Sequence, residues 1–327
     1  MAKRPDPTQD AIRDLNQLRG QPEAERGPLL AKHLASKSNW VVAKAAKVAA
    51  ELHQDDAIPA LVAAFHRLMA APQQLDKGCM ALTEIAAALY TLDHYDSELL
   101  LTGIRHIQLE ASFGPPTDTA VQLRSHCAAG LAQTHHPDAA IELVRLLADH
   151  EAGARAGAVR AIGTLPNEAG ALLLRFKVLT GDPEIEVIAE CFASLLACDP
   201  ARSIRFVAGY CDDTDETIAE AAVLALGDSR RPGAVEALKE RWKHFVVGPM
   251  KKILLLALAT ARRESSVDFL LKLLAEENPR SALDVLHAMR IYQHDESVWR
   301  SVTEIVEKRG DRALMDRLRA LAAGINR

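Results

Sequence analysis

Small and apolar residues recur along the chain in a ten-residue pattern, which is clearest as ARAGAVRAIG at 154–163. Further copies occupy 123–132, 187–196, 218–227 and 250–259, and weaker copies begin at Val41, Lys77 and Ser281. Positions one, five, eight and nine of a copy are mostly small or apolar. Because successive helical residues are rotated by about 100°, these four positions share one side of a helix. The pattern therefore predicts one buried helix face that is used repeatedly.

The spacing of the copies predicts the architecture. From position 123 onward, successive copies begin 31 to 33 residues apart. A period of this size is typical of stacked helical hairpins, in which each repeat packs on its neighbours. We therefore expect an all-α fold, a right-handed α-solenoid (alpha-alpha superhelix) of about eight helical hairpins. We expect an N-terminal tail and capping helix at 1–22, the solenoid at 23–310 and a C-terminal capping helix at 311–327.

Turn and capping residues predict several helix boundaries. We expect a helix over Leu75–Leu92 and a long helix from Asp96 to about Glu110. Asp182 and Asn278 each precede a proline, and a capping side chain followed by proline is common where a helix begins. We therefore expect both residues to cap helices that carry the pattern.

One repeat interval is longer than the others because of the segment EASFGPPTDT, near 110–119. Gly114, Pro115 and Pro116 exclude a helix there. Insertions in a solenoid lie in loops on one face and often carry function, so Phe113 is a candidate contact residue. The alternative is an ordinary surface loop with Phe113 folded back onto its own helix.

Composition narrows the possible functions. The formal net charge of −5 speaks against non-specific binding of nucleic acid, which needs a strongly positive surface. The five cysteines are an odd number without tight spacing, so they do not resemble a disulfide framework. The first ten residues lack the apolar region of a secretory signal, and the apolar run 253–261 is too short to span a bilayer. We therefore expect a soluble cytoplasmic protein with no membrane insertion.

Motifs for catalysis or metal binding are not found in the sequence. There is no HExxH, CxxC, Walker-type glycine loop or GxSxG, and His150-Glu151 is the only His-Glu pair. We therefore expect no catalytic residues, no metal and no cofactor.

The segments ARAGAVRAIGTL, IAEAAVLALGDS and LRSHCAAGLAQT, with turns such as GDPEI and HHPDA, resemble the HEAT-repeat superfamily. They are most similar to the short HEAT-like repeats first recognised in phycobilin lyase subunits, and the resemblance covers about 23–310. It implies a helical solenoid and a range of functions, since the family includes scaffolds, adaptors, assembly chaperones and a few enzymes. The family's basic residue at the second position of the pattern is present as Arg124, Arg155 and Lys251.

Helical phase suggests which residues line a concave surface made by the inner helices. Position seven of the pattern is apolar at Leu224 and Leu256, with charges nearby at Glu220 and Lys252. An apolar strip with charged edges is how an amphipathic partner helix is commonly held. The alternative is that the two leucines only pack against each other between repeats. We expect electrostatic selection of the partner from Arg124, Arg155, Arg160, Lys251 and Lys252.

The most basic local stretch is 230–263, with nine Lys or Arg, and it also contains Trp242 and Phe245. Such a stretch could hold phosphate or an acidic partner. The alternative is a set of solvated helix faces, because its basic residues are divided between two helices.

The functional prediction is a non-enzymatic scaffold, adaptor or assembly factor that binds an amphipathic or acidic protein segment on the concave inner-helix surface. The first alternative, suggested by the resemblance, is a lyase-type or chaperone-like accessory subunit of an enzyme. Nucleic-acid binding ranks third. The identity of the partner and the oligomeric state stay open.

Overall fold

The computed structural model describes residues 7–134, 136–165, 168–243 and 248–325, so Phe245 lies outside the described residues. In these ranges the chain forms twenty α-helices, five short 3-10 helices and two strands of two residues each. The predicted all-α class is confirmed. None of the described helices is long and apolar enough to cross a membrane.

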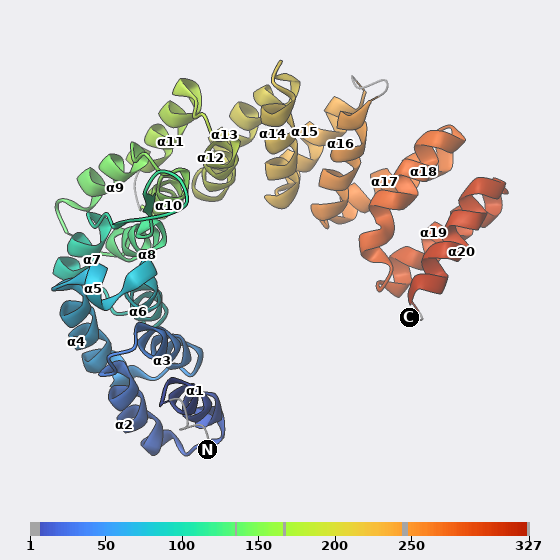
Figure 1. Ribbon diagram of the computed structural model, residues 1–327. Coiled ribbons are helices and arrows are strands. Elements are labelled where there is room, and N and C mark those ends of the chain that lie inside the picture. The colour runs from blue at the N-terminus through green and yellow to red at the C-terminus, as the bar shows by residue number, and fades with distance from the viewer. Residues whose placement is uncertain (1–6, 135, 166–167, 244–247, 326–327) are drawn as a thin grey trace. The chain divides into compact units, whose positions relative to one another are not determined.

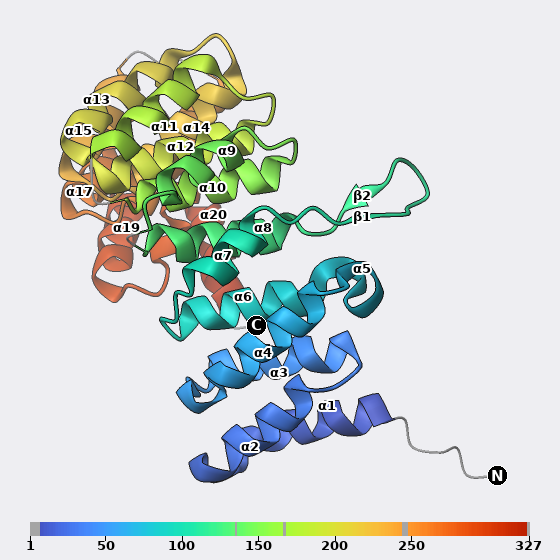
Figure 2. The same ribbon diagram turned by 90° about the vertical axis from the view of Figure 1, so that its left-hand side faces the viewer.

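The chain divides into two compact units, residues 1–170 and 171–327. In unit 1 the helices that carry the ten-residue pattern pack on one another in succession, and we call them, with α1, the pattern row of the unit. They are α1 (Pro7–Gln17), α3 (Asn39–Glu51), α6 (Met80–Thr91), α8 (Val121–Ala132) and α10 (Ala152–Gly163). A second row covers one side of it (Figures 1 and 2). This cover row is α2 (Glu23–Leu34), α4 (Ile58–Met69), α7 (Ser97–Ile104) and α9 (Ala139–Leu147), with the short α5 (Pro72–Leu75) after α4.

Unit 2 has the same two-row arrangement, and α11 (Glu168–Thr180) begins at the boundary between the units. Its pattern row is α12 (Ile185–Cys198), α14 (Glu216–Asp228), α16 (Pro249–Thr260), α18 (Pro279–Ala288) and α20 (Arg312–Ile325). Its cover row is α13 (Pro200–Ala208), α15 (Pro232–Trp242), α17 (Glu264–Glu276) and α19 (Glu296–Arg309).

The core lies between the two rows of each unit, where the pattern predicts it. In α10, positions one, five, eight and nine are Ala154, Ala158, Ala161 and Ile162, and all four are buried. Small residues also let neighbouring helices of the pattern row approach closely. A β-carbon added at Gly157 in α10 would lie 2.4 Å from the Ser125 hydroxyl oxygen in α8.

Two predicted helices are shorter than expected. The helix predicted over Leu75–Leu92 is interrupted, because Gly78 and Cys79 have φ angles of 77° and 50°, and α6 starts only at Met80. The helix predicted over 96–110 ends at Ile104, since the chain leaves the helix to form a strand. Both predictions of length were wrong because hydrophobic periodicity continued past the local break.

The two predicted caps differ in outcome. Asn278 caps α18, because its side-chain oxygen accepts hydrogen bonds from the N–H groups of Arg280 and Ser281, both at 3.1 Å. Asp182 does not cap α12, which starts three residues later at Ile185. Its carboxylate instead accepts the N–H of Glu184 at 3.0 Å and pairs with the Lys177 ammonium at 2.7 Å.

The insertion near 110–119 is a small antiparallel hairpin formed by β1 (Leu109–Glu110) and β2 (Thr117–Asp118). Leu109 pairs with Asp118 and Glu110 with Thr117. Figure 2 shows the hairpin extending away from the helices of unit 1. Phe113, between the strands, is fully exposed, so it is not folded back onto a helix.

Candidate protein-binding groove

The candidate site lies between α14 and α16, two neighbours in the pattern row of unit 2. Asp215 begins α14 by accepting the N–H of Thr217 at 2.9 Å, and Pro249 begins α16 after Gly248, whose φ is 132°. At their C-terminal ends the helices touch: a β-carbon added at Gly227 would lie 2.5 Å from the Ala257 carbonyl oxygen. The pocket described next lies at their N-terminal ends.

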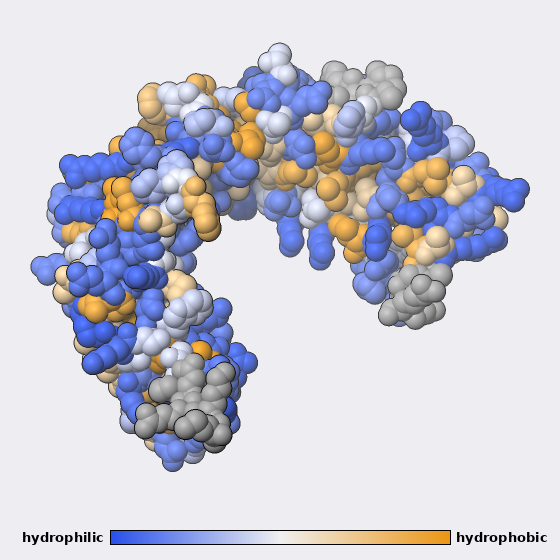
Figure 3. Space-filling model, viewed as in Figure 1, coloured by the Kyte–Doolittle hydropathy of each residue, from blue (hydrophilic) through white to orange (hydrophobic). Residues whose placement is uncertain are grey.

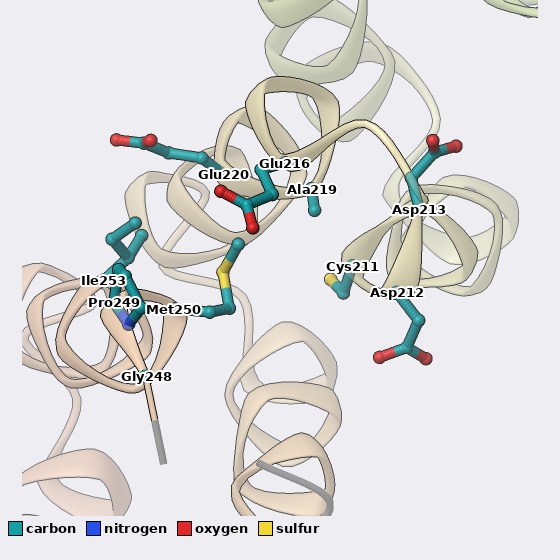
Figure 4. A pocket seen from close by; sticks show the side chains of 10 residues that line it. All are labelled: Cys211, Asp212, Asp213, Glu216, Ala219, Glu220, Gly248, Pro249, Met250 and Ile253. Carbon is teal, nitrogen blue, oxygen red and sulfur yellow. The ribbon is translucent and has the colours of Figure 1, made fainter.

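This pocket has a volume of about 380 Å³ and both apolar and acidic walls. Its apolar lining includes Ala219 from α14, Met250 from α16 and Cys211 from the preceding turn. Figure 4 shows the Glu216 carboxylate and the Met250 side chain pointing toward one another, with the Cys211 sulfur directed between the two helices. The Glu220 carboxylate points away from this centre along the edge of the pocket (Figure 4). The pocket can therefore hold an apolar side chain beside a negative charge.

The acidic residues of the pocket differ in their pairing. Asp212 forms an ion pair with Arg241, whose guanidinium also donates to the Ala208 carbonyl oxygen at 3.1 Å. Glu216 and Glu220 are exposed, and neither forms an ion pair within the part of the chain that the structure describes. Their negative charges therefore face solvent at the edge of the pocket.

Cys211 lines the pocket as a neutral thiol. Burial raises the pKa of its thiol to about 12, so the neutral form dominates near neutral pH. Within the described ranges, no group of three or more His, Cys, Asp or Glu is placed to hold a metal ion. The groove is thus suited to binding by apolar contact and charge.

The two predicted leucines lie one helical turn beyond residues that line the pocket. Leu224 is half-buried and lies four residues after Glu220 on α14, and Leu256 is 42% exposed and lies three residues after Ile253 on α16. Residues three or four apart share a helix face, so both leucines continue the line of pocket residues toward the C-terminal ends of the helices. Figure 3 shows hydrophobic residues among hydrophilic ones on the visible face of α14 and α16. We call the pocket together with Leu224 and Leu256 the α14–α16 groove.

The two predicted lysines have different environments. The Lys251 ammonium lies 4.1 Å from the centre of the Trp242 ring and 3.9 Å from the Glu277 carboxylate, and its side chain is only 15% exposed. The positive charge of Lys251 is therefore paired with groups of the protein itself. Lys252 is exposed and lies 3.5 Å from the Asp284 carboxylate of α18, the next helix of the pattern row. Trp242 is buried, which leaves it no face for stacking on a nucleic-acid base.

Arg124 and Arg155 are buried, and this corrects the expectation that they present charge to a partner. Arg124 is 2% exposed and pairs with Asp118 at 2.7 Å and Asp149 at 3.1 Å. The second distance joins Arg124 Nε and Asp149 Oδ2 without hydrogen-bond geometry, while Nη2 donates to Asp149 Oδ1 at 3.2 Å. Arg155 donates to the carbonyl oxygens of Asp149 and His150, both at 2.9 Å. Both guanidiniums therefore bind groups of unit 1 itself.

A buried polar network at the base of the hairpin was missed by the sequence analysis. Gln108 is fully buried and donates to the Asp76 carbonyl oxygen at 2.9 Å and to the Glu110 carboxylate at 2.6 Å. Asp118 accepts the N–H groups of Gln108 at 3.1 Å and Ala120 at 2.9 Å. The hairpin is therefore anchored at its base while Phe113 is exposed at its other end.

Arg160, the remaining predicted residue, is exposed on α10 in unit 1. It lies near His126 of α8: burial lowers the pKa of that imidazole, and the positive charge of Arg160 lowers it further. Arg160 is a residue of unit 1, whereas the α14–α16 groove belongs to unit 2.

No family model matches the sequence, and no curated protein matches it. The solved structures that are similar to this chain include the following two. One is the crystal structure of an engineered protein, with 18% identity and a TM-score of 0.39, covering 97% of this chain and 95% of that protein. The other is the complex of CpcE and CpcF of phycocyanin lyase from Nostoc sp. PCC7120, with 17% identity and a TM-score of 0.37, covering 78% of this chain and 94% of that one.

Proposed function

We propose that this protein is a non-enzymatic adaptor, scaffold or assembly factor that binds a segment of another protein in the α14–α16 groove. The observation that supports this function most directly is that Leu256 is 42% exposed. The helix that carries it also lines, together with α14, a pocket of about 380 Å³. The helical pairs of both units are proposed to be HEAT-like hairpins of a right-handed α-solenoid, with capping segments at 1–22 and 311–327. The proposed location is cytoplasmic.

An amphipathic helix is the partner structure that suits such a groove. Helical segments bind apolar grooves through side chains spaced three or four residues apart, which fall on one face. Burial of one leucine-sized side chain contributes about 1.5–3 kcal/mol, so two or three anchors are needed to exceed the cost of association. Met250, Ile253, Leu224 and Leu256 offer contacts for anchors of this kind along the groove.

Other exposed residues are proposed as secondary contacts. Lys252 is exposed on α16 beside Asp284, and it is proposed as a contact for a polar group of the bound segment. Phe113 and Arg160 are exposed on unit 1 and are proposed to contact a partner there.

Site-specific crosslinking tests the proposed function. A photoreactive amino acid is placed at Leu256 in the groove and, as the control, at Lys272, which is exposed on α17 in the cover row. We expect the protein with the photoreactive group at position 256 to form a covalent adduct with a partner protein. An excess of wild type without that group should suppress the adduct, because it competes for the partner. An excess of the Leu256→Asp variant should not suppress it. Equal adduct yields at the two positions, or equal suppression by the variant, would contradict binding in the groove.

A further inference from the structure

We infer that the α14–α16 groove selects a basic amphipathic helix, with lysine or arginine at the end that reaches Glu216. This inference rests on the proposed function and specifies the class of partner. It differs from the acidic partner that the basic residues of the sequence suggested, because Arg124, Arg155 and Lys251 are occupied within the protein.

The charges that line the pocket favour a basic partner. Asp213, Glu216 and Glu220 line the pocket, and among the described residues that line it none is basic. A carboxylate in the first turn of a helix is favoured by the helix dipole, which is enough to explain Glu216. It does not explain Glu220, which lies one turn further on and carries a second unpaired charge at the edge of the pocket. A positively charged partner would satisfy both carboxylates.

The spacing of the two glutamates matches the repeat of a partner helix. Glu216, Glu220 and Leu224 follow one another at four-residue intervals on α14, so each step along the helix is about 6 Å. A partner helix lying beside α14 has the same rise per turn. Lysine or arginine at two positions four residues apart would therefore match the two glutamates, and an apolar residue one turn later would meet Leu224. Lys252, at the edge of α16, is offset by Asp284 and does not reverse this preference.

Two synthetic peptides test the inference on the full-length protein. Both are helical and share the same leucine positions, but one carries lysine and the other glutamate at the two positions four residues apart. Binding is measured by fluorescence anisotropy of a labelled peptide. We expect the lysine peptide to bind at least about tenfold more tightly than the glutamate peptide, and its affinity to fall as salt is added.

Protein variants test whether the groove glutamates cause the preference for the lysine peptide. Replacing both groove glutamates (Glu216→Gln with Glu220→Gln) should weaken binding of the lysine peptide about fivefold to tenfold, as two charge contacts are lost. The matched control removes two exposed glutamates from α19 in the cover row (Glu304→Gln with Glu307→Gln) and should leave affinity unchanged. Leu256→Asp should weaken binding of the lysine peptide, and circular dichroism checks that each variant is folded.

The outcomes separate the two proposals. If the glutamate peptide binds as tightly as the lysine peptide and loses affinity with Leu256→Asp, the groove binds helices but the charge preference is wrong. If the groove and control glutamate variants behave alike, the preference is also overturned. If Leu256→Asp changes the affinity of neither peptide, the groove is not a helix-binding site. That result would contradict both the proposed function and the inference.

Discussion

Gly227 in α14 lies so close to Ala257 in α16 that a β-carbon at Gly227 would be 2.5 Å from the Ala257 carbonyl oxygen and 2.7 Å from its Cα atom. Real β-carbons do not approach backbone atoms this closely, and backbone yields less readily than a flexible side chain. This contact therefore sets the separation of the two helices at one end of the groove.

Gly227→Ala should lower the free energy of unfolding by about 2 kcal/mol, the usual cost of forcing an extra methyl group into a packed interface. The control is Gly209→Ala at the C-terminal end of α13, where φ is −62° and the added β-carbon meets no neighbouring atom within 4 Å. Urea unfolding followed by circular dichroism measures both. Equal effects of the two substitutions would mean that α14 and α16 do not touch at Gly227 and Ala257.

Removal of the Arg124 side chain should be costly because it leaves Asp118 buried without its cation. The Asp118 side chain is 6% exposed, and breaking a buried ion pair by deleting one partner costs about 3–5 kcal/mol. We expect a loss of this size for Arg124→Met in urea unfolding. Arg105→Met is the control, because Arg105 is 55% exposed and its partner Glu142 keeps Arg145 at 2.7 Å. Solvent screens that surface pair, so its loss should cost much less than the loss of the buried pair. Similar losses in the two variants would contradict a buried role for Arg124.

The same carboxylate should make stability depend on pH. Burial alone would raise the pKa of Asp118, but hydrogen bonds from the Ala120 and Gln108 N–H groups and from Arg124 outweigh it, and the net shift is downward. A carboxyl with a lower pKa in the folded state stabilises the protein above its ordinary pKa, and this contribution is lost as pH falls through the folded value. The advantage of wild type over Asp118→Asn should therefore be largest near neutral pH and shrink below about pH 4. A constant difference in unfolding free energy across this range would show that ionisation of Asp118 does not contribute.

Phe113 should be dispensable for folding because its side chain is fully exposed. Phe113→Ala should change the free energy of unfolding by less than about 0.5 kcal/mol, as surface substitutions usually do. The control, Phe65→Ala, removes a fully buried ring from α4 and should cost about 3–5 kcal/mol. A large loss for Phe113→Ala would mean that the ring packs on the protein in solution and is not available to a partner.

The helical class was predictable because the buried positions recur at helical spacing along the sequence of each helix. The pattern around Ala154 and Ala158 depends only on residues a turn or two apart, and both are buried as expected. The break at Gly78 and Cys79 was missed because apolar residues recur at helical spacing on both sides of it, at Leu75, Cys79 and Leu82, and outweighed the signal of Gly78.

The site was less predictable because burial of a charge depends on residues from elsewhere in the chain. Arg124 occupies a position of the pattern that the resemblance marks as basic, and nothing in its own helix shows whether it faces solvent. Its partners Asp118 and Asp149 come from the hairpin and from the segment before α10. Leu256 was identified from helical phase alone, whereas the acidic end of its groove depends on how α14 and α16 diverge from the contact at Gly227.

Cysteine labelling tests the packing of the two rows directly. All five cysteines are free thiols, but Cys198 at the end of α12 is exposed while the other four are buried. Burial raises the pKa of the Cys79, Cys191 and Cys211 thiols to about 12, so these groups are both protonated and inaccessible. A disulfide reagent at mildly alkaline pH should therefore modify one thiol per folded chain rapidly, and all five in concentrated guanidinium chloride. Cys198→Ser should abolish the rapid reaction. Rapid labelling of any thiol in that variant would mean that the packing around a buried cysteine opens to solvent in the native state.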